Sequence, residues 1–223
     1  FVLAAAMTKG EIEITDFPMH HLDSFWQKCE EAGIQYEIKN NTVQIQKIKE
    51  LKPISSLKTA IHPSFPTDLQ APFAVLLTQA QGVSKIFETL FDGRLGYLFE
   101  LEKMGARFEM LNPHQAIIIG KTSLKGAEIN SCDIRAGAGM VIAALGATGT
   151  STISNILYID RGYENLEQKL RSLGADIVRN DTEKTMEKPN STAKIQKIIS
   201  TVPSRSVRRI AAPVRESRES VSG

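Results

Sequence analysis

Apolar and polar positions follow two different periods along the chain, and the order of these periods predicts a mixed α/β fold. Residues 11–14 alternate strictly, as a half-buried strand does. Residues 19–32 carry apolar side chains at helical spacing, and Gly33 ends that pattern. Residues 34–38 and 42–45 alternate again on either side of a polar turn, which predicts a hairpin.

The same succession of helix, glycine, strand, helix, glycine and strand occurs three times. The glycines that mark it recur at intervals of about 70 residues, in the two series Gly10, Gly82, Gly149 and Gly33, Gly105, Gly174. The pattern divides the chain into units of about 1–50, 51–123 and 124–181. The elements predicted for the second and third units are the strand 82–86, the helix 94–104, the hairpin 107–111 with 115–119, the helix 134–147, the strand 149–153, the helix 163–173 and the strand 175–179.

A unit of this size cannot cover both faces of its own sheet. We therefore expect the three units to pack their helices against one another in one shared core, with the sheets outside. Both ends of this domain are predicted to be open, and its N-terminal end to be incomplete. No strand precedes the first helix at residues 1–8, and the strand 175–179 lacks a hairpin partner. Because an unpaired strand edge is a liability, we expect upstream sequence to complete the sheet.

The composition is that of a soluble globular protein, with 223 residues, 42% of them hydrophobic and 23% charged. No run approaches 18 apolar residues, and the segment 1–7 lacks the basic flank and cleavage site of a signal peptide. We therefore predict a cytoplasmic protein without a membrane segment. Cys29 and Cys132 are isolated, which argues against both a disulfide and a metal site.

The charge is divided unevenly between the body of the chain and its last residues. Residues 182–223 carry nine Lys and Arg against four Asp and Glu, whereas residues 1–181 carry eighteen against twenty-one. Residues 182–223 contain no aromatic side chain, so we predict a basic and mostly disordered tail. Within it, residues 191–199 are compatible with a short amphipathic helix. The absence of interleaved aromatics argues against nucleic-acid binding.

The segment His62–Gln70 delivers a carboxylate to the start of a helix predicted for residues 71–80. Its two prolines stiffen an extended approach, after which Thr67 or Asp68 is suited to cap the helix. The structural interpretation of Asp68 is therefore an N-cap. The functional one is a carboxylate that works beside bound substrate.

Three arginines are predicted to stand at helix starts, where a cation is unfavourable beside the positive end of the helix dipole: Arg94, Arg135 and Arg161. Asp92, Asp133 and Asp160 lie close enough in sequence to neutralise them one by one, so structural ion pairs are one explanation. The other is an anion site, because backbone N–H groups and guanidinium forks both bind phosphate or carboxylate. The three arginines together favour the anion site, near Asp68.

Several motifs then identify a family resemblance. The chain from residue 1 to about residue 180 resembles the C-terminal portion of the UDP-N-acetylglucosamine 1-carboxyvinyltransferases, a family of enolpyruvyl transferases. The motifs that carry the resemblance are Phe65-Pro66-Thr67-Asp68-Leu69-Gln70, the segment 91–94, Met104-Gly105-Ala106, Asp133-Ile134-Arg135-Ala136-Gly137-Ala138 and Ile159-Asp160-Arg161-Gly162-Tyr163-Glu164. The resemblance implies an inside-out α/β barrel domain of three βαβαββ units, one of two such domains that close over a cleft. This agrees with the repeat.

The resemblance also implies the reaction and the residue roles. The 3′-hydroxyl of UDP-N-acetylglucosamine adds to C2 of phosphoenolpyruvate, and the tetrahedral intermediate then loses phosphate. Asp68 would contact the sugar hydroxyl and act as its base, and Leu90 would lie against UDP-N-acetylglucosamine. Arg94 and Arg161 would hold the phosphate and carboxylate of phosphoenolpyruvate, and Arg135 would belong to the same charged cleft. No metal or organic cofactor is implied.

The resemblance covers only part of the catalytic machinery. The family's other domain carries a Lys-Asn pair and a loop cysteine or aspartate that serves as general acid, and neither Cys29 nor Cys132 lies in a matching motif. We therefore expect the chain to be inactive alone and to need an N-terminal half of the same enzyme as a partner. The segment 92–97 keeps the arginine of the family pattern but lacks its usual histidine, and residues 182–223 have no counterpart.

Two alternatives remain at this point. One is a non-catalytic, nucleotide-sugar-binding or regulatory fragment whose basic tail docks on a partner. The other is the sister enzyme, a 3-phosphoshikimate enolpyruvyl transferase, which would be favoured by a Lys-Glu-Ser/Thr-Asp-Arg motif before the helix of the second unit. Residues 91–94 do not supply that motif.

Overall fold

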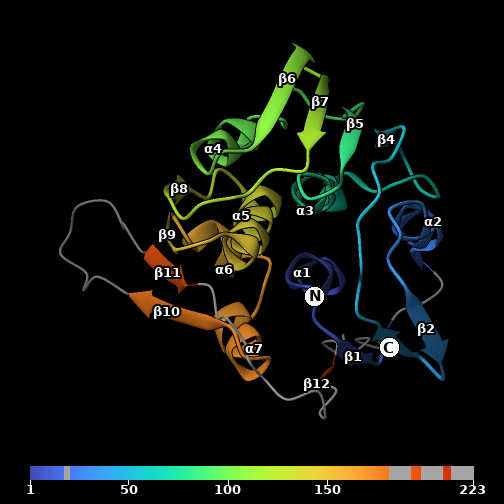
Figure 1. Ribbon diagram of the computed structural model, residues 1–223, viewed down its shortest axis with the longest axis vertical. Helices are drawn as coiled ribbons and strands as arrows, with labels where there is room; N and C mark the ends of the chain where they lie inside the picture. The colour runs from blue at the N-terminus through green and yellow to red at the C-terminus, as the bar shows by residue number, and fades with distance from the viewer. Residues whose placement is uncertain (18–20, 181–191, 197–207, 212–223) are drawn as a thin grey trace, which may run out of the picture.

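A computed structural model describes residues 1–17, 21–180, 192–196 and 208–211 of the chain. It is a mixed α/β structure with three four-stranded sheets arranged around a group of helices (Figure 1). None of the helices in these described ranges is long and apolar enough to cross a membrane.

The second sheet is built from one continuous stretch of chain. Its order is β4-β5-β7-β6, with the strands β4 (Leu57–Lys58), β5 (Gly82–Phe87), β7 (Gln115–Gly120) and β6 (Arg107–Asn112). β4 runs parallel to β5, and the remaining pairs are antiparallel. β6 and β7 form the hairpin that alternation predicted, with a register shift between Met110 and Asn112.

The other two sheets have the same order, but each takes one strand from the end of the chain. The third sheet is β8-β9-β11-β10, with β8 (Glu128–Asn130), β9 (Thr150–Ser154), β11 (Thr192–Gln196) and β10 (Asp176–Asn180). The first sheet is β12-β1-β3-β2, with β12 (Arg208–Ala211), β1 (Ile12–Thr15), β3 (Thr42–Ile45) and β2 (Tyr36–Lys39). In each sheet, one of the two edge strands runs parallel to its neighbour. These parallel pairs are β4 with β5, β8 with β9 and β12 with β1.

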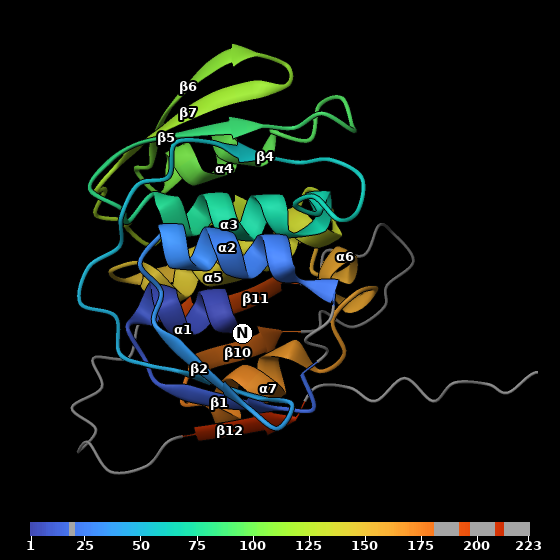
Figure 2. The same cartoon turned by 90° about the vertical axis from the view of Figure 1, so that its right-hand side faces the viewer.

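Three helices lie in the interior, between the sheets. They are α1 (Val2–Thr8), α3 (Gln70–Leu77) and α5 (Ile134–Gly146), and they contact one another in pairs (Figures 1 and 2). All eight residues of α3 are buried, which explains why its sequence is apolar on every side rather than along one stripe. The outer helices are α2 (Asp23–Glu31), α4 (Tyr97–Lys103), α6 (Leu157–Asp160) and α7 (Leu166–Ser172).

The predicted open edges are occupied in the structure, so that part of the prediction is wrong. β11 pairs antiparallel with both β9 and β10, and therefore supplies the partner that the strand 175–179 was expected to lack. β12 pairs with β1 in register Ile12 to Arg208, in the place where upstream sequence was expected. The helix predicted within 191–199 is also wrong, because residues 192–196 are extended. The rest of residues 182–223 lies outside the described ranges.

Other differences from the sequence patterns concern where helices begin. α2 begins at Asp23, and residues 18–20 at the predicted start lie outside the described ranges. α4 begins at Tyr97 rather than at residue 94, because residues 92–96 form turns. The predicted helix 163–173 is shorter, since α7 begins only at Leu166 and a separate short helix, α6, precedes it. Two of these shifts change the local setting of candidate arginines.

Candidate active site at the start of the central helices

Asp68 lies on a single turn of 3₁₀ helix, Thr67–Leu69, that leads into α3. Its side chain is 71% exposed and makes no capping hydrogen bond to the helix. The N-cap interpretation of Asp68 is therefore wrong. Its Oδ1 atom lies 3.1 Å from Nε of Arg135 and 3.9 Å from Nη1 of Arg94. Asp68, Arg94 and Arg135 are called the Asp68 cluster below. They are far apart in the sequence, and the tertiary fold brings them together.

Arg135 is the second residue of α5, and the cap of that helix leaves its side chain free to reach Asp68. Asp133 is the N-cap, and its Oδ1 accepts hydrogen bonds from the backbone N–H groups of Arg135 at 2.7 Å and Ala136 at 3.0 Å. The same oxygen is 3.9 Å from Arg135 Nε. The Nε atom is buried, and its shorter contact with Asp68 is an ion pair rather than a well-aligned hydrogen bond.

Arg94 is held from two sides in the turn before α4. Its Nη1 donates a hydrogen bond of 2.6 Å to Oγ1 of Thr67, and its guanidinium lies 3.9 Å from the centre of the Phe91 ring. Only 12% of the side chain is exposed. Asp92, which the sequence suggested as its ion-pair partner, instead lies 3.0 Å from Nε2 of His114.

Leu90 is joined to this region through its backbone. Its N–H donates to Oε1 of Glu88 at 2.9 Å, while its side chain is 38% exposed. Glu88 follows β5 and is completely buried, yet sequence patterns alone did not single it out. An acidic residue at the end of an apolar strand was the available signal, because buried carboxylates are rare unless they have partners.

Arg161 is not at a helix start. It is the C-cap of the four-residue helix α6, and its guanidinium lies 5.6 Å from the centre of the Tyr158 ring. Asp160, its expected partner, instead forms two hydrogen bonds with Arg179, at 2.8 and 2.9 Å. A Cβ atom at Gly162 would lie 2.5 Å from Cγ2 of Ile134, so the segment after α6 packs against the first residue of α5. The residue after Arg161 therefore packs against the residue before Arg135. In the described part of the chain, however, no ion pair joins Arg161 to the Asp68 cluster.

Tyr163 is a further residue of this region that sequence analysis did not place in the site. Burial raises the pKa of its phenol, and the negative charge of Asp68 raises it further, whereas the nearby positive charge of Arg135 lowers it. Its hydroxyl therefore stays protonated near neutral pH and can donate or accept a hydrogen bond beside the Asp68 cluster.

The start of α3, the start of α5 and α6 lie at the same end of the molecule, on the right in Figure 2. This end presents one exposed carboxylate next to two guanidinium groups. Such a set suits a substrate that carries anionic oxygens and a group that must lose a proton. Among the described ranges, no group of three or more His, Cys, Asp and Glu side chains is placed to hold a metal ion.

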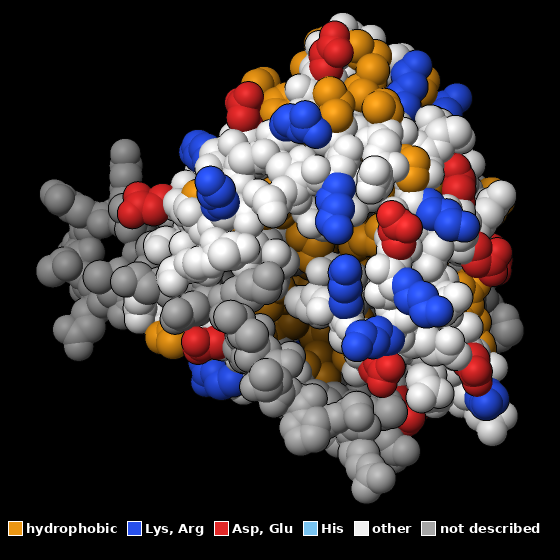
Figure 3. Space-filling view, in the orientation of Figure 1, with side chains coloured by type: hydrophobic (Ala, Val, Ile, Leu, Met, Phe, Trp, Pro, Cys, Tyr) orange, Lys and Arg blue, Asp and Glu red, His pale blue; other side chains and the backbone are white. Residues whose placement is uncertain are grey.

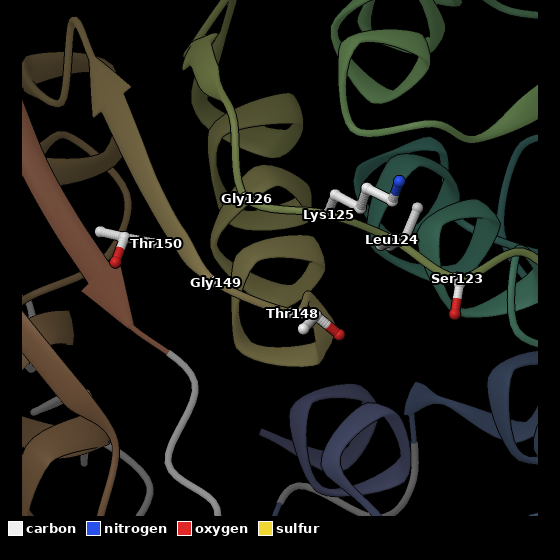
Figure 4. Close-up of a pocket in the computed structure, with 7 residues that line it drawn as sticks. All are labelled: Ser123, Leu124, Lys125, Gly126, Thr148, Gly149 and Thr150. Atoms are coloured by element: carbon white, nitrogen blue, oxygen red, sulfur yellow. The ribbon is translucent and has the colours of Figure 1, made fainter.

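A cavity of about 300 Å³ lies elsewhere, past the C-terminal end of α5. Figure 4 shows its lining, which consists of residues 123–126 and 148–150. Because α5 has 13 residues, its two ends are about 20 Å apart, so this cavity is not part of the Asp68 region. Figure 3 shows a hollow lined by apolar side chains near the centre of the face seen in Figure 1, and more apolar side chains at the end formed by β6 and β7.

Comparison with known proteins places the chain in a family. Residues 1–170 match the family model of EPSP synthase (3-phosphoshikimate 1-carboxyvinyltransferase). The chain is 44% identical over 187 residues to a UDP-N-acetylglucosamine 1-carboxyvinyltransferase of Prochlorococcus marinus (strain MIT 9312), a match that covers 84% of this chain and 40% of that protein. It is 42% identical over 179 residues to the protein of the same name from Campylobacter lari, covering 80% of this chain and 42% of that one. The chain thus spans about two fifths of the length of these relatives.

Two solved structures are similar in fold. The enolpyruvyl transferase NikO from Streptomyces tendae superposes with a TM-score of 0.71 at 24% identity, covering 78% of this chain and 42% of that one. EPSP synthase from Acinetobacter baumannii superposes with a TM-score of 0.66 at 17% identity, covering 95% and 48%. From the match over residues 1–170, the chain belongs to the EPSP synthase (3-phosphoshikimate 1-carboxyvinyltransferase) family.

Proposed function

We propose that the chain is the C-terminal part of a UDP-N-acetylglucosamine 1-carboxyvinyltransferase. This enzyme would transfer the enolpyruvyl group of phosphoenolpyruvate to the 3′-hydroxyl of UDP-N-acetylglucosamine and release phosphate, a step of peptidoglycan precursor synthesis. The curated relatives that carry this name support the proposal, at 44% and 42% identity. Because the chain spans only about two fifths of their length, the activity belongs to a larger assembly.

The observation that carries the proposal is the Asp68 cluster, an exposed carboxylate within 4 Å of two guanidinium groups. In the proposed reaction Asp68 takes the proton of the 3′-hydroxyl, whose oxygen bonds to C2 of phosphoenolpyruvate while C3 gains a proton. The bond from C2 to the phosphate oxygen then breaks, and C3 loses a proton to restore the double bond. A base at this position would accept its proton beside cations that stabilise the anionic form of the substrate.

The arginines would fix the second substrate. Arg94 and Arg161 would hold the phosphate and carboxylate of phosphoenolpyruvate, and Arg135 would contribute the positive charge of its guanidinium at the start of α5. Leu90 would lie against UDP-N-acetylglucosamine. The tight hold on Arg94 supports this assignment, because a fixed guanidinium loses little freedom when an anion binds.

The wider organisation follows from the same assignment. We propose that residues 1–181 are an inside-out α/β barrel domain of three βαβαββ units, at about 1–50, 51–123 and 124–181. Residues 182–223 are a basic extension, of which β11 and β12 pair with strands of this domain. The identical strand order of the three sheets supports three equivalent units. We also propose that an enzyme with this function is located in the cytoplasm.

The general acid would come from an N-terminal half of the same enzyme, which would also close the cleft over the substrates. The loss of one acid or base slows such reactions by about a hundred- to ten-thousand-fold. The chain alone is therefore expected to be inactive.

The test is phosphate release from phosphoenolpyruvate and UDP-N-acetylglucosamine, measured with the chain alone and with the N-terminal half of a relative added. We expect no release by the chain alone and recovery on mixing. Asp68→Ala and Arg161→Ala should abolish the recovered rate. The matched controls Asp176→Ala and Arg107→Ala change exposed residues of β10 and β6 and should leave that rate unchanged.

Each other outcome contradicts a defined part of the proposal. Release by the chain alone would contradict the need for a second half. No phosphate release with or without the N-terminal half, together with binding of UDP-N-acetylglucosamine, would favour a non-catalytic binding or regulatory fragment. Release with shikimate 3-phosphate in place of the sugar nucleotide would favour the sister activity whose name the family model carries.

A further inference from the structure

Glu88 is a completely buried acidic residue whose side chain is fully engaged by its neighbours. Its Oε1 accepts hydrogen bonds from Oγ1 of Thr59 and from the backbone N–H of Leu90, both at 2.9 Å. Its Oε2 accepts a hydrogen bond of 2.8 Å from Oγ1 of Thr67. A buried carboxylate without hydrogen-bond partners would lower the stability of the fold by roughly several kcal/mol. The three donors therefore explain how Glu88 is tolerated in the interior.

Thr67 connects this buried carboxylate to Arg94. A threonine hydroxyl has one hydrogen, and a carboxylate can only accept, so the hydrogen of Thr67 is directed at Glu88. The lone pairs of the same oxygen then accept from Nη1 of Arg94, at 2.6 Å. The direction of donation along Arg94, Thr67 and Glu88 is fixed, and the Phe91 ring restricts the guanidinium plane from another side.

We infer that Glu88 is a positioning residue for the substrate site, which it serves by orienting Arg94 through Thr67 and by fixing the backbone of Leu90. The inference rests on the proposed function, in which Arg94 and Leu90 contact the substrates. Glu88 itself lies beneath the site and touches neither substrate. Its effect reaches both subsites because its two oxygens bind different segments, one before α3 and one before α4.

A purely structural role is the competing explanation. Thr59 follows β4, and it also accepts two hydrogen bonds from Thr89. Its hydroxyl accepts from the Thr89 N–H at 3.0 Å, and its carbonyl accepts from the Thr89 hydroxyl at 2.6 Å. Glu88 thus also helps to join the second sheet to the segment after it. A structural role alone would change stability and would leave the affinity for phosphoenolpyruvate in the folded protein unchanged. The two explanations therefore differ in a measurable quantity.

Two substitutions interrupt the connection at different points. Thr67→Val keeps the shape of the side chain but removes the acceptor for Arg94, and Thr67→Ser keeps the hydroxyl. Glu88→Gln places an amide nitrogen in one acceptor position, so that the Thr67 hydroxyl loses an acceptor. In the mixture with the N-terminal half, we expect Thr67→Val and Glu88→Gln to raise KM for phosphoenolpyruvate about 10- to 100-fold, and kcat to change less.

Thr67→Ser should keep KM within about threefold of the parent chain, because the hydroxyl is retained. Thr78→Val is the control, since Thr78 is a buried threonine at the C-terminal end of α3, whereas the partly buried Thr67 precedes the start of that helix. It should affect stability alone. Unfolding midpoints in urea confirm that each variant is folded under assay conditions.

A second readout needs no activity. In nitrogen-15 NMR spectra of the chain alone, a guanidinium held by Thr67 gives resolved Arg94 Nη signals, which Arg94→Ala identifies by their loss. We expect Thr67→Val and Glu88→Gln to broaden these signals and Thr67→Ser to retain them. Unchanged signals in both Thr67→Val and Glu88→Gln, or an unchanged KM in Thr67→Val where Arg94→Ala raises it, would overturn the inference. An unchanged KM in Arg94→Ala would instead overturn the proposed function while leaving the NMR result intact.

Discussion

At the scale of single residues, the environment of a side chain decides what chemistry it can perform. Asp68 is exposed between two arginines, whereas Glu88, which accepts a hydrogen bond from the neighbouring Thr67, is completely buried and has hydrogen-bond donors on both oxygens. One carboxylate is exposed to solvent, and the other is enclosed by its hydrogen-bond donors. Sequence patterns identified Asp68, Arg94 and Arg135 as candidates and favoured an anion site near Asp68. They could not identify Glu88, since its role depends on hydroxyl groups that other segments bring to it.

The two cysteines provide a test at the same scale. Cys29 is fully buried, and burial raises its pKa far above the ordinary thiol value, while Cys132 is exposed and its pKa is also raised by partial burial. Because the thiolate is the reactive species and must be accessible, we expect a thiol reagent at pH 8 to modify Cys132 and to spare Cys29. Mass spectrometry of the labelled peptides measures this.

Cys132→Ser serves as the control for that experiment and should abolish rapid labelling of the native chain. Full labelling of both cysteines should appear only in denaturant. Rapid modification of Cys29 in native buffer would contradict the packing described for α2, on which this residue lies.

At the scale of elements, α5 is notable because it combines tight packing with a capped N-terminus that carries a candidate residue. Gly137 and Gly139 lie inside this helix, where their lack of a side chain allows close contact with neighbouring segments. A Cβ at Gly137 would clash with the Ser131 hydroxyl and would lie 2.6 Å from Cγ1 of Ile159. A Cβ at Gly139 would meet Cγ2 of Val75 at 3.3 Å, which a small shift relieves.

This difference predicts unequal effects on stability for two similar substitutions. Gly137→Ala should lower the free energy of unfolding by about 1–2 kcal/mol, because the clash outweighs the gain in helix propensity. Gly139→Ala should stay within about 1 kcal/mol of the parent chain. Urea denaturation followed by circular dichroism measures both. Equal effects of the two substitutions would contradict the packing of α5 against the segment that contains Ile159.

Helix starts are the element feature that sequence patterns located least well. The apolar pattern of 163–173 does not distinguish one helix from a turn followed by α7, which begins at Leu166. As a result Arg161 was expected at a helix start, whereas it is the C-cap of α6, where a cation is electrostatically compatible with the helix dipole. Short-range patterns describe which face is apolar, but the first hydrogen-bonded turn depends on the neighbouring segments.

At the scale of the whole molecule, the three sheets are equivalent in strand order although their strands come from different parts of the chain. β11 lies between β9 and β10, and β12 covers an edge of β1. These two strands connect the last residues of the chain to both the third and the first sheet. Removing them would leave backbone N–H and C=O groups unpaired along three strands.

A truncation after Asn180 tests the importance of this pairing. We expect the shortened chain to lose at least about 2 kcal/mol of unfolding free energy, because several net hydrogen bonds disappear, and to self-associate through its exposed edges. Urea denaturation and size-exclusion chromatography measure the two effects. Removal of residues 214–223 is the control, since both strands remain, and it should change neither property. A truncated chain as stable and monomeric as the parent would contradict the described pairing.

The sequence by itself determined the mixed α/β fold, the threefold recurrence of its elements and most strand positions, because apolar periodicity and glycine stops are local properties. It also identified the family through motifs around Asp68, Arg94, Arg135 and Arg161. Only the tertiary structure decided that Asp68 pairs with arginines instead of capping α3, that Glu88 supports Arg94, and that residues 192–196 and 208–211 complete two sheets. These outcomes depend on contacts between segments far apart in the chain, whose energies no local pattern contains.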